Sequence, residues 1–164
     1  MPNSNHQTYM QIALEQASIA RDIDEVPVGA IVVLDGEIIG VGHNTSISAS
    51  DPTSHAEINA IRSACEKVGN YRLPGAELYV TLEPCSMCVG AMIHARIKVL
   101  VFGASDPKTG AAGGVSDLVN VEQHKHKMEV VSGVMEAECR ELLQSFFKQK
   151  RLQAKANKIE NNNE

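Results

Sequence analysis

The chain has 164 residues and a mass of 17.7 kDa, with 43% apolar and 21% charged residues, which is ordinary for one globular domain. Its net charge of −5 argues against a general nucleic-acid binder. The sequence has no apolar run of about 18 residues that could span a membrane, and its polar start, residues 1–6, lacks a secretion signal. We therefore expect a single cytoplasmic domain over residues 1–164, with no membrane partner.

Helical and strand patterns alternate along the chain. In order, we predict a helix over about 5–22, strands over 28–34 and 37–42, a helix over 55–68, a strand over 78–82, a helix over 85–95, strands over 97–103 and 128–131, and a basic helix over about 135–158. Asp35-Gly36 predicts a tight hairpin turn, and Gly69 ends the second helix. The tail 159–164 is predicted to fray. This alternation favours a mixed sheet with helices on both faces.

Three residues have the composition of a zinc site: His55, Cys85 and Cys88. One imidazole and two thiolates suit zinc, and three protein ligands leave a fourth position open, as in catalytic sites. Zinc with an open position can lower the pKa of a water to about 7. Glu57 lies two residues after His55, where it can move protons. We therefore predict one Zn²⁺ per subunit, with Glu57 as the catalytic residue.

These residues allow other interpretations. Cys85 and Cys88 alone could form a redox pair, but such a pair needs no upstream His-x-Glu. A closed structural zinc site needs a fourth ligand. Cys65 cannot readily supply it, because it lies about 15 Å along the helix from His55 at ~1.5 Å per residue. Glu57 could instead form a capping box with Ser54. With the two cysteines present, we favour catalysis.

Several longer segments carry a resemblance to a known family. They are residues 25–30, 51–57, 70–73, 79–85, 90–97, 101–104 and 106–113. On these segments, from about Tyr9 to Arg151, the chain resembles the bacterial tRNA-specific adenosine deaminases of the cytidine-deaminase-like superfamily. The H-x-E…P-C-x-x-C signature is a known mark of the zinc-dependent nucleobase deaminases, these tRNA enzymes among them. Residues 92–97 and 106–113 are more specific to the tRNA enzymes.

The resemblance implies a three-layer α/β/α, cytidine-deaminase-like fold around a five-stranded mixed sheet. It implies hydrolytic conversion of adenosine to inosine at the wobble position of a tRNA anticodon stem-loop, chiefly of an arginine tRNA, by a homodimer. By the same resemblance, six residues are implied to bind the substrate nucleotide or the RNA around it: Val28, Asn44, Asp106, Lys108, Phe146 and Arg151.

The residues themselves leave plainer alternatives open. Asn44, Asp106 and Lys108 lie in predicted loops and could serve turns alone. Phe146 and Phe147 could be core, and the basic helix could be a solvated face. A deaminase of free bases or nucleotides, such as a guanine deaminase, would share the zinc residues. A noncatalytic zinc or RNA-binding module is the alternative from a different class.

Overall fold

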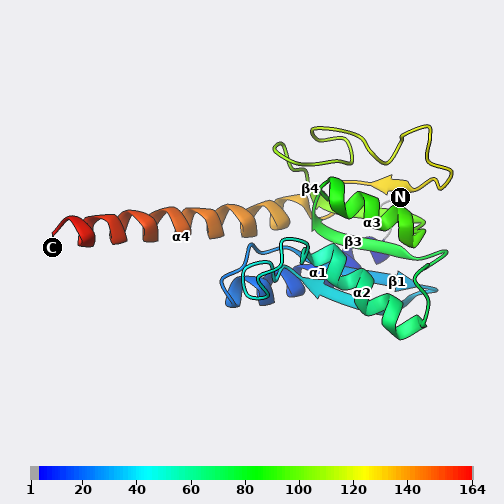
Figure 1. Ribbon diagram of the computed structural model, residues 1–164, viewed down its shortest axis with the longest axis horizontal. Helices are drawn as coiled ribbons and strands as arrows, with labels where there is room; N and C mark the ends of the chain where they lie inside the picture. Colours follow the sequence, from blue (N-terminus) through cyan, green and yellow to red (C-terminus); the bar gives the residue numbers. More distant parts are fainter. Residues whose placement is uncertain (1–3, 164) are drawn as a thin grey trace.

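The computed structural model describes residues 4–163 of the chain (Figure 1). Its elements, in order, are α1 (Ser4–Asp22), β1 (Gly29–Leu34), β2 (Glu37–His43), α2 (Ala56–Val68), β3 (Glu77–Leu82), α3 (Ser86–Ala95), β4 (Val99–Ala104), β5 (Glu129–Val131) and α4 (Glu136–Asn162). Every predicted element is present. The bounds agree within two residues, except that α4 ends four residues later than predicted.

The five strands form one mixed sheet in the order β2-β1-β3-β4-β5. Strand β1 pairs antiparallel with both β2 and β3, whereas β3, β4 and β5 run parallel. Helix α3 connects β3 to β4, as predicted for a parallel pair. The carboxyl ends of β3 and β4 therefore lie at one edge of the sheet, where loops usually form the functional site of an open α/β fold.

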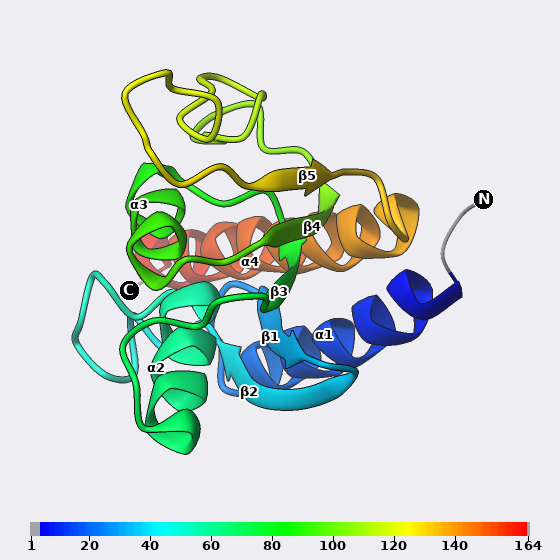
Figure 2. The same cartoon turned by 90° about the vertical axis from the view of Figure 1, so that its right-hand side faces the viewer.

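The sheet is covered on both faces, which confirms the predicted three-layer architecture (Figure 2). Alternating side chains divide the core into two clusters because successive residues of a strand face opposite ways. Ile31 and Tyr79 pack with α1 and α4 on one face. Val32 and Val80 pack with α2 and α3 on the other face.

Two predicted chain reversals have the expected backbone. Asp35 and Gly36 both have positive φ, 51° and 76°, which is the pattern of a type I′ hairpin turn. Gly69 has φ 75° and ψ 28°, and its N–H is bonded to the carbonyl of Cys65 at the end of α2. Both turns use backbone conformations that favour glycine, or asparagine and aspartate, over other residues.

Helix α2 lies unusually close to strand β2. A Cβ on Gly42 would stand 2.5 Å from the carbonyl oxygen of Ala56 and 2.5 Å from the nitrogen of Ala60. Gly40 makes the same kind of contact one turn further along the helix. The two glycines thus set how near the first turn of α2 can come to the sheet.

Helix α4 begins against the sheet and then extends well beyond the body of the protein (Figure 1). Phe146 is its last buried residue, and every described residue from Arg151 onward is exposed. The helix continues to Asn162, past its predicted end at residue 158, and fraying of the tail from residue 159 onward stays a prediction; Glu164 lies outside the described residues. Within residues 4–163, no helix has the length and apolar character needed to cross a bilayer.

Candidate metal centre and active site

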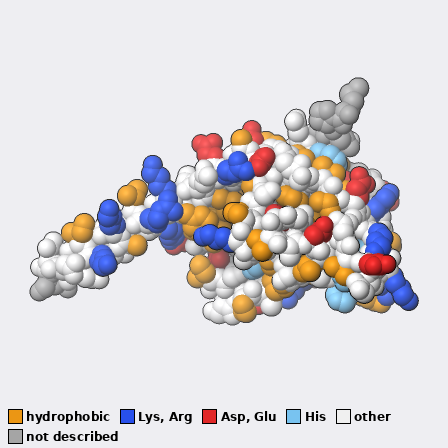
Figure 3. All heavy atoms as spheres, turned by 90° about the horizontal axis from the view of Figure 1, so that it is seen from above, with side chains coloured by type: hydrophobic (Ala, Val, Ile, Leu, Met, Phe, Trp, Pro, Cys, Tyr) orange, Lys and Arg blue, Asp and Glu red, His pale blue; other side chains and the backbone are white. Residues whose placement is uncertain are grey.

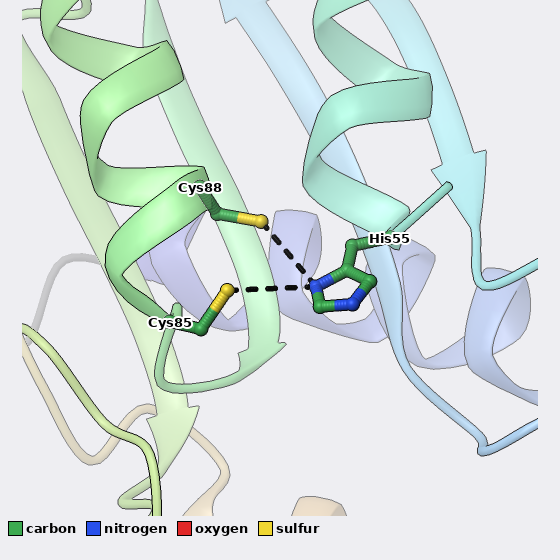
Figure 4. Close-up of side chains that lie close together, drawn as sticks. All are labelled: His55, Cys85 and Cys88. Atoms are coloured by element: carbon green, nitrogen blue, oxygen red, sulfur yellow. Dashed lines mark hydrogen bonds between the residues drawn. The ribbon is translucent and has the colours of Figure 1, made fainter. Parts of the chain in front are cut away.

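The predicted metal ligands come together where two helices begin. His55 is the N-cap residue of α2 and Cys85 is the N-cap residue of α3. Figure 4 shows the side chains of His55, Cys85 and Cys88 pointing toward one another across the gap between these helices. The two sulfurs each lie 3.6 Å from Nδ1 of His55. Helix N-termini carry partial positive charge, so this position also stabilises cysteine thiolates.

These distances fit a tetrahedral metal ion. With zinc–sulfur bonds of about 2.3 Å and zinc–nitrogen bonds of about 2.0–2.1 Å, tetrahedral angles place a sulfur and a nitrogen about 3.6 Å apart. One nitrogen equidistant from two sulfurs matches a shared cation better than it matches a single N–H donor. Within residues 4–163, these three residues form the one group of three or more potential ligands gathered closely enough to hold a metal ion.

The electrostatics of the two cysteines also suit a cation. A hydrogen bond from Cys88, together with one from His55, lowers the pKa of Cys85 to about 4. The contact with Cys85 and burial raise the pKa of Cys88. The pair therefore shares one proton, and a soft cation can bind both sulfurs by displacing it. Cys65 and Cys139 lie outside this group, and none of the four cysteines forms a disulfide.

Glu57 lies beside the metal ligands and does not cap the helix. Its side chain is 4% exposed, and this burial raises the pKa of its carboxyl group. The capping-box interpretation is wrong, because the helix starts at His55 and the hydroxyl of Ser54 donates instead to Asp51, at 2.9 Å. A buried carboxyl with a raised pKa, next to three residues that could hold a metal ion, is suited to carry protons.

A small pocket of about 120 Å³ opens onto Glu57 and two of the predicted metal ligands, His55 and Cys85. Residues from five separate segments line it, among them Val28, Asn44, Glu57, Cys85, Asp106 and Thr109. Three of the six predicted substrate residues, Val28, Asn44 and Asp106, are thus at the pocket. Asn44 also has a structural role that the sequence did not indicate: its Oδ1 accepts the backbone N–H of Ala56 at 2.8 Å, which caps α2.

Asp106 serves a turn as well as lining the pocket. Its carboxylate accepts the backbone N–H groups of Lys108 and Thr109 at 2.9 and 3.2 Å, and the hydroxyl of Thr109 at 2.9 Å. The turn interpretation of Asp106 is therefore correct for its carboxylate. Lys108 does not line the pocket but borders the groove next to it.

The neighbouring groove, of about 490 Å³, runs between the Asp106–Thr109 turn and α4. Phe147 lines it and is 44% exposed, whereas Phe146 is 6% exposed and belongs to the core. Phe146 thus packs in the core, one of the two alternatives that the sequence left open, and Phe147 is the exposed aromatic at that point of the helix. A contact of Phe146 with RNA stays a prediction. Arg151 is exposed on the part of α4 that leaves the body, where Lys and Arg side chains gather (Figure 3).

Comparison with known proteins identifies the family. A family model described as MafB19-like deaminase matches residues 4–151. A tRNA-specific adenosine deaminase of Haemophilus influenzae is 51% identical over 150 residues, which are 91% of this chain and 87% of that protein. One from Bacillus subtilis is 46% identical over 90% of this chain and 92% of its own length. The chain belongs to the tRNA-specific adenosine deaminase family.

Solved structures agree with membership in the tRNA-specific adenosine deaminase family. A structure from a study of A-to-I editing by tRNA:A34 deaminases at the wobble position superposes with a TM-score of 0.80, at 47% identity, over 83% of this chain and 99% of that one. A guanine deaminase of Bacillus subtilis is 40% identical with a TM-score of 0.58, over 61% of this chain and 64% of its own. The likeness to the tRNA deaminase structure therefore extends over more of this chain than the likeness to the guanine deaminase does.

Proposed function

We propose that this protein converts adenosine to inosine at the wobble position of a tRNA anticodon by zinc-dependent hydrolytic deamination. The observation that carries the proposal is the meeting of His55, Cys85 and Cys88 at a pocket that His55, Cys85 and the buried Glu57 line. The family likeness supports the substrate, because relatives named tRNA-specific adenosine deaminases match about 90% of the chain.

His55, Cys85 and Cys88 would hold the zinc ion, one per subunit. When bound, zinc supplies a positive charge that makes water a stronger acid and hence a better nucleophile at neutral pH. Two thiolates and a neutral imidazole are the ligands expected for such a site. His55 lies at the N-terminus of α2 and the two cysteines lie at the N-terminus of α3, which stabilises the thiolates and fixes the direction of the ligand atoms.

Glu57 would carry the protons of the reaction. Its carboxylate takes a proton from the water that attacks C6 and delivers it to N1 of the adenine. It then moves the proton of the new C6 hydroxyl to the amino nitrogen, so that the C6–N bond breaks, ammonia leaves and the C6 carbonyl of inosine forms. Burial raises the pKa of Glu57, which makes its carboxylate a stronger base for taking the proton from water. Burial at 4% exposure keeps bulk water away from this exchange.

The base pocket and its groove would hold the target nucleotide and its neighbours. An anticodon loop presents unpaired bases, so a base can turn out of the loop at little cost. Val28, Asn44 and the turn at Asp106 form the walls that receive the base. Lys108 and Phe147 border the groove where the flanking nucleotides would lie, with an aromatic face for stacking.

The exposed part of α4 would follow the phosphate backbone. Lys148, Arg151, Lys155 and Lys158 lie on this part of the helix, and cations there add sequence-independent affinity. The remaining expectations rest on the family: a homodimer, an arginine tRNA as main substrate, and a place in the cytoplasm with that tRNA. We propose them together with the reaction.

A deaminase of free bases is the nearest alternative, because the guanine deaminase of Bacillus subtilis shares this architecture. The test is to incubate the zinc-loaded protein with an anticodon stem-loop, with free adenosine and with guanine, and to measure ammonia and inosine. We expect products from the stem-loop alone. Ammonia from guanine would favour the small-molecule enzyme, and tight RNA binding without ammonia would favour a noncatalytic module.

A further inference from the structure

Glu83 is a buried carboxylate to which the proposed reaction assigns no role. It follows the last residue of β3, is 3% exposed, and stands two residues before Cys85. Its backbone N–H is bonded to the carbonyl of Ala104 at 2.8 Å, at the end of the neighbouring strand β4. Glutamate is almost never buried to this degree unless its oxygens are fully partnered.

The partners of Glu83 all lie in the loop over residues 106–114. One carboxylate oxygen accepts the backbone N–H of Asp106 at 3.0 Å. The other accepts the N–H groups of Ala112 and Gly114 at 3.0 and 2.8 Å. A single side chain thus holds both ends of this loop. Hydrogen bonds to a carboxylate are about twice as strong as those between neutral groups.

The glycines of the loop fit this contact. A Cβ on Gly110 or on Gly114 would stand 2.4 Å from Oε1 of Glu83. Neither glycine has the positive φ that would by itself favour glycine. The carboxylate therefore explains why this segment holds glycines at both positions: the backbone must approach it closely enough for its N–H groups to bond.

The loop that Glu83 holds forms a wall of the base pocket, through Asp106 and Thr109. The same residue is tied through the chain to Cys85, one of the proposed metal ligands. We propose that Glu83 is a positioning residue, which fixes the 106–114 wall at a set place relative to the metal centre and so determines binding of the target nucleotide. This inference rests on the proposed function for the nature of the substrate.

Glu83→Gln is the sharpest test of this role. Glutamine keeps the size of the side chain but offers one acceptor oxygen. That oxygen would remain with Ala112 and Gly114, and the NH₂ group would face the N–H of Asp106. The turn at Asp106 should then loosen first. We expect amide hydrogen exchange at Asp106 to rise about tenfold, the equivalent of one hydrogen bond of about 1.4 kcal/mol.

The kinetic expectation is a split between KM and kcat. KM for the anticodon stem-loop should rise about tenfold, whereas kcat should change by less than about threefold, because Glu57 and the metal ligands stay in place. Zinc content should match that of the unaltered protein. Asp117→Asn is the matched control: Asp117 also accepts backbone N–H groups, those of Val119 and Asn120, but lies outside the pocket lining.

Gly110→Ala tests the same contact from the side of the loop and serves if the Glu83 variant folds poorly. Its KM should rise in the same way. In the double variant Glu83→Gln/Gly110→Ala, KM should rise by less than the two single effects combined. Unchanged exchange at Asp106 together with an unchanged KM in Glu83→Gln would overturn the proposal. An equal rise of KM in Asp117→Asn, or loss of zinc in Glu83→Gln, would also overturn it. Hydrogen exchange is measured without substrate, so it tests the positioning role of Glu83 independently of the proposed function.

Discussion

Gly42→Ala should impair catalysis from outside the active site. Gly42 lies in β2 beneath the first turn of α2, the helix that carries Glu57 and has His55 as its N-cap residue. A Cβ at this position would stand 2.5 Å from the Ala56 oxygen and the Ala60 nitrogen, whereas ordinary contacts begin near 3.4 Å. Both opposing atoms belong to the helix backbone, so a side chain cannot simply rotate away. Helix α2 must retreat by about 1 Å.

The size of the effect follows from that displacement. A misplacement of about 1 Å at reacting groups can lower the rate about 100-fold. Overpacking of this kind costs about 1–3 kcal/mol of stability, and each kcal/mol shifts Tm by about 2–4 °C in a domain of this length. We therefore expect kcat/KM to fall about 100-fold while most of the protein remains folded at 25 °C.

Gly69→Ala is the matched control on the same helix. Gly69 has φ 75° at the far end of α2, and an added Cβ meets nothing within 4 Å there. The left-handed backbone costs alanine about 1–2 kcal/mol, with no push on the first turn of the helix. Tm should fall by a similar amount in both variants, measured by circular dichroism, but activity on the stem-loop should fall in Gly42→Ala alone. Equal activity in the two variants would refute this reasoning.

Three further predictions concern the centre and the RNA surface. Glu57→Gln should keep its zinc and lose about 10²–10⁴ in kcat in stem-loop assays; a near-normal rate would reject the proton-transfer role. Chelation, or Cys88→Ser, should lower Tm by at least about 2–4 °C, the equivalent of 1 kcal/mol, because the metal binds the folded state; an unaltered Tm would argue against a metal site. Replacing Arg151 and Lys155 by Gln should flatten the plot of log affinity against log salt by about 0.7 for each lost phosphate contact, and an unchanged slope would assign them to a solvated face.

Much of the fold is predictable from local patterns. Continuous apolar, largely β-branched runs predict the central strands, Asp35-Gly36 predicts the hairpin turn, and Gly69 predicts the end of α2. The metal centre is predictable because its residue types are rare together and each group falls at a helix start. The turn and helix-end signals lie within a few residues of the features that they predict, whereas the proposed metal ligands, 30 and 33 positions from His55, are found by their residue types.

The features that were missed depend on contacts between distant segments. Glu83 bonds residues 23–31 positions away, and Asn44 caps a helix that begins 12 residues later, so no local pattern shows either role. A burial signal for Phe146 was present, since Cys139, Leu143 and Phe146 recur at helical spacing. Without knowing which face of α4 meets the sheet, the sequence could not separate Phe146 from Phe147.

The central claim is a metal ion held by one imidazole and two sulfurs, with one position left for water. X-ray absorption at the zinc edge of the purified protein tests it most directly. The account predicts two sulfur neighbours at about 2.3 Å, and one nitrogen and one further oxygen at about 2.0–2.1 Å. A protein purified without a transition metal, or a zinc ion whose four neighbours are all protein side chains, would contradict it.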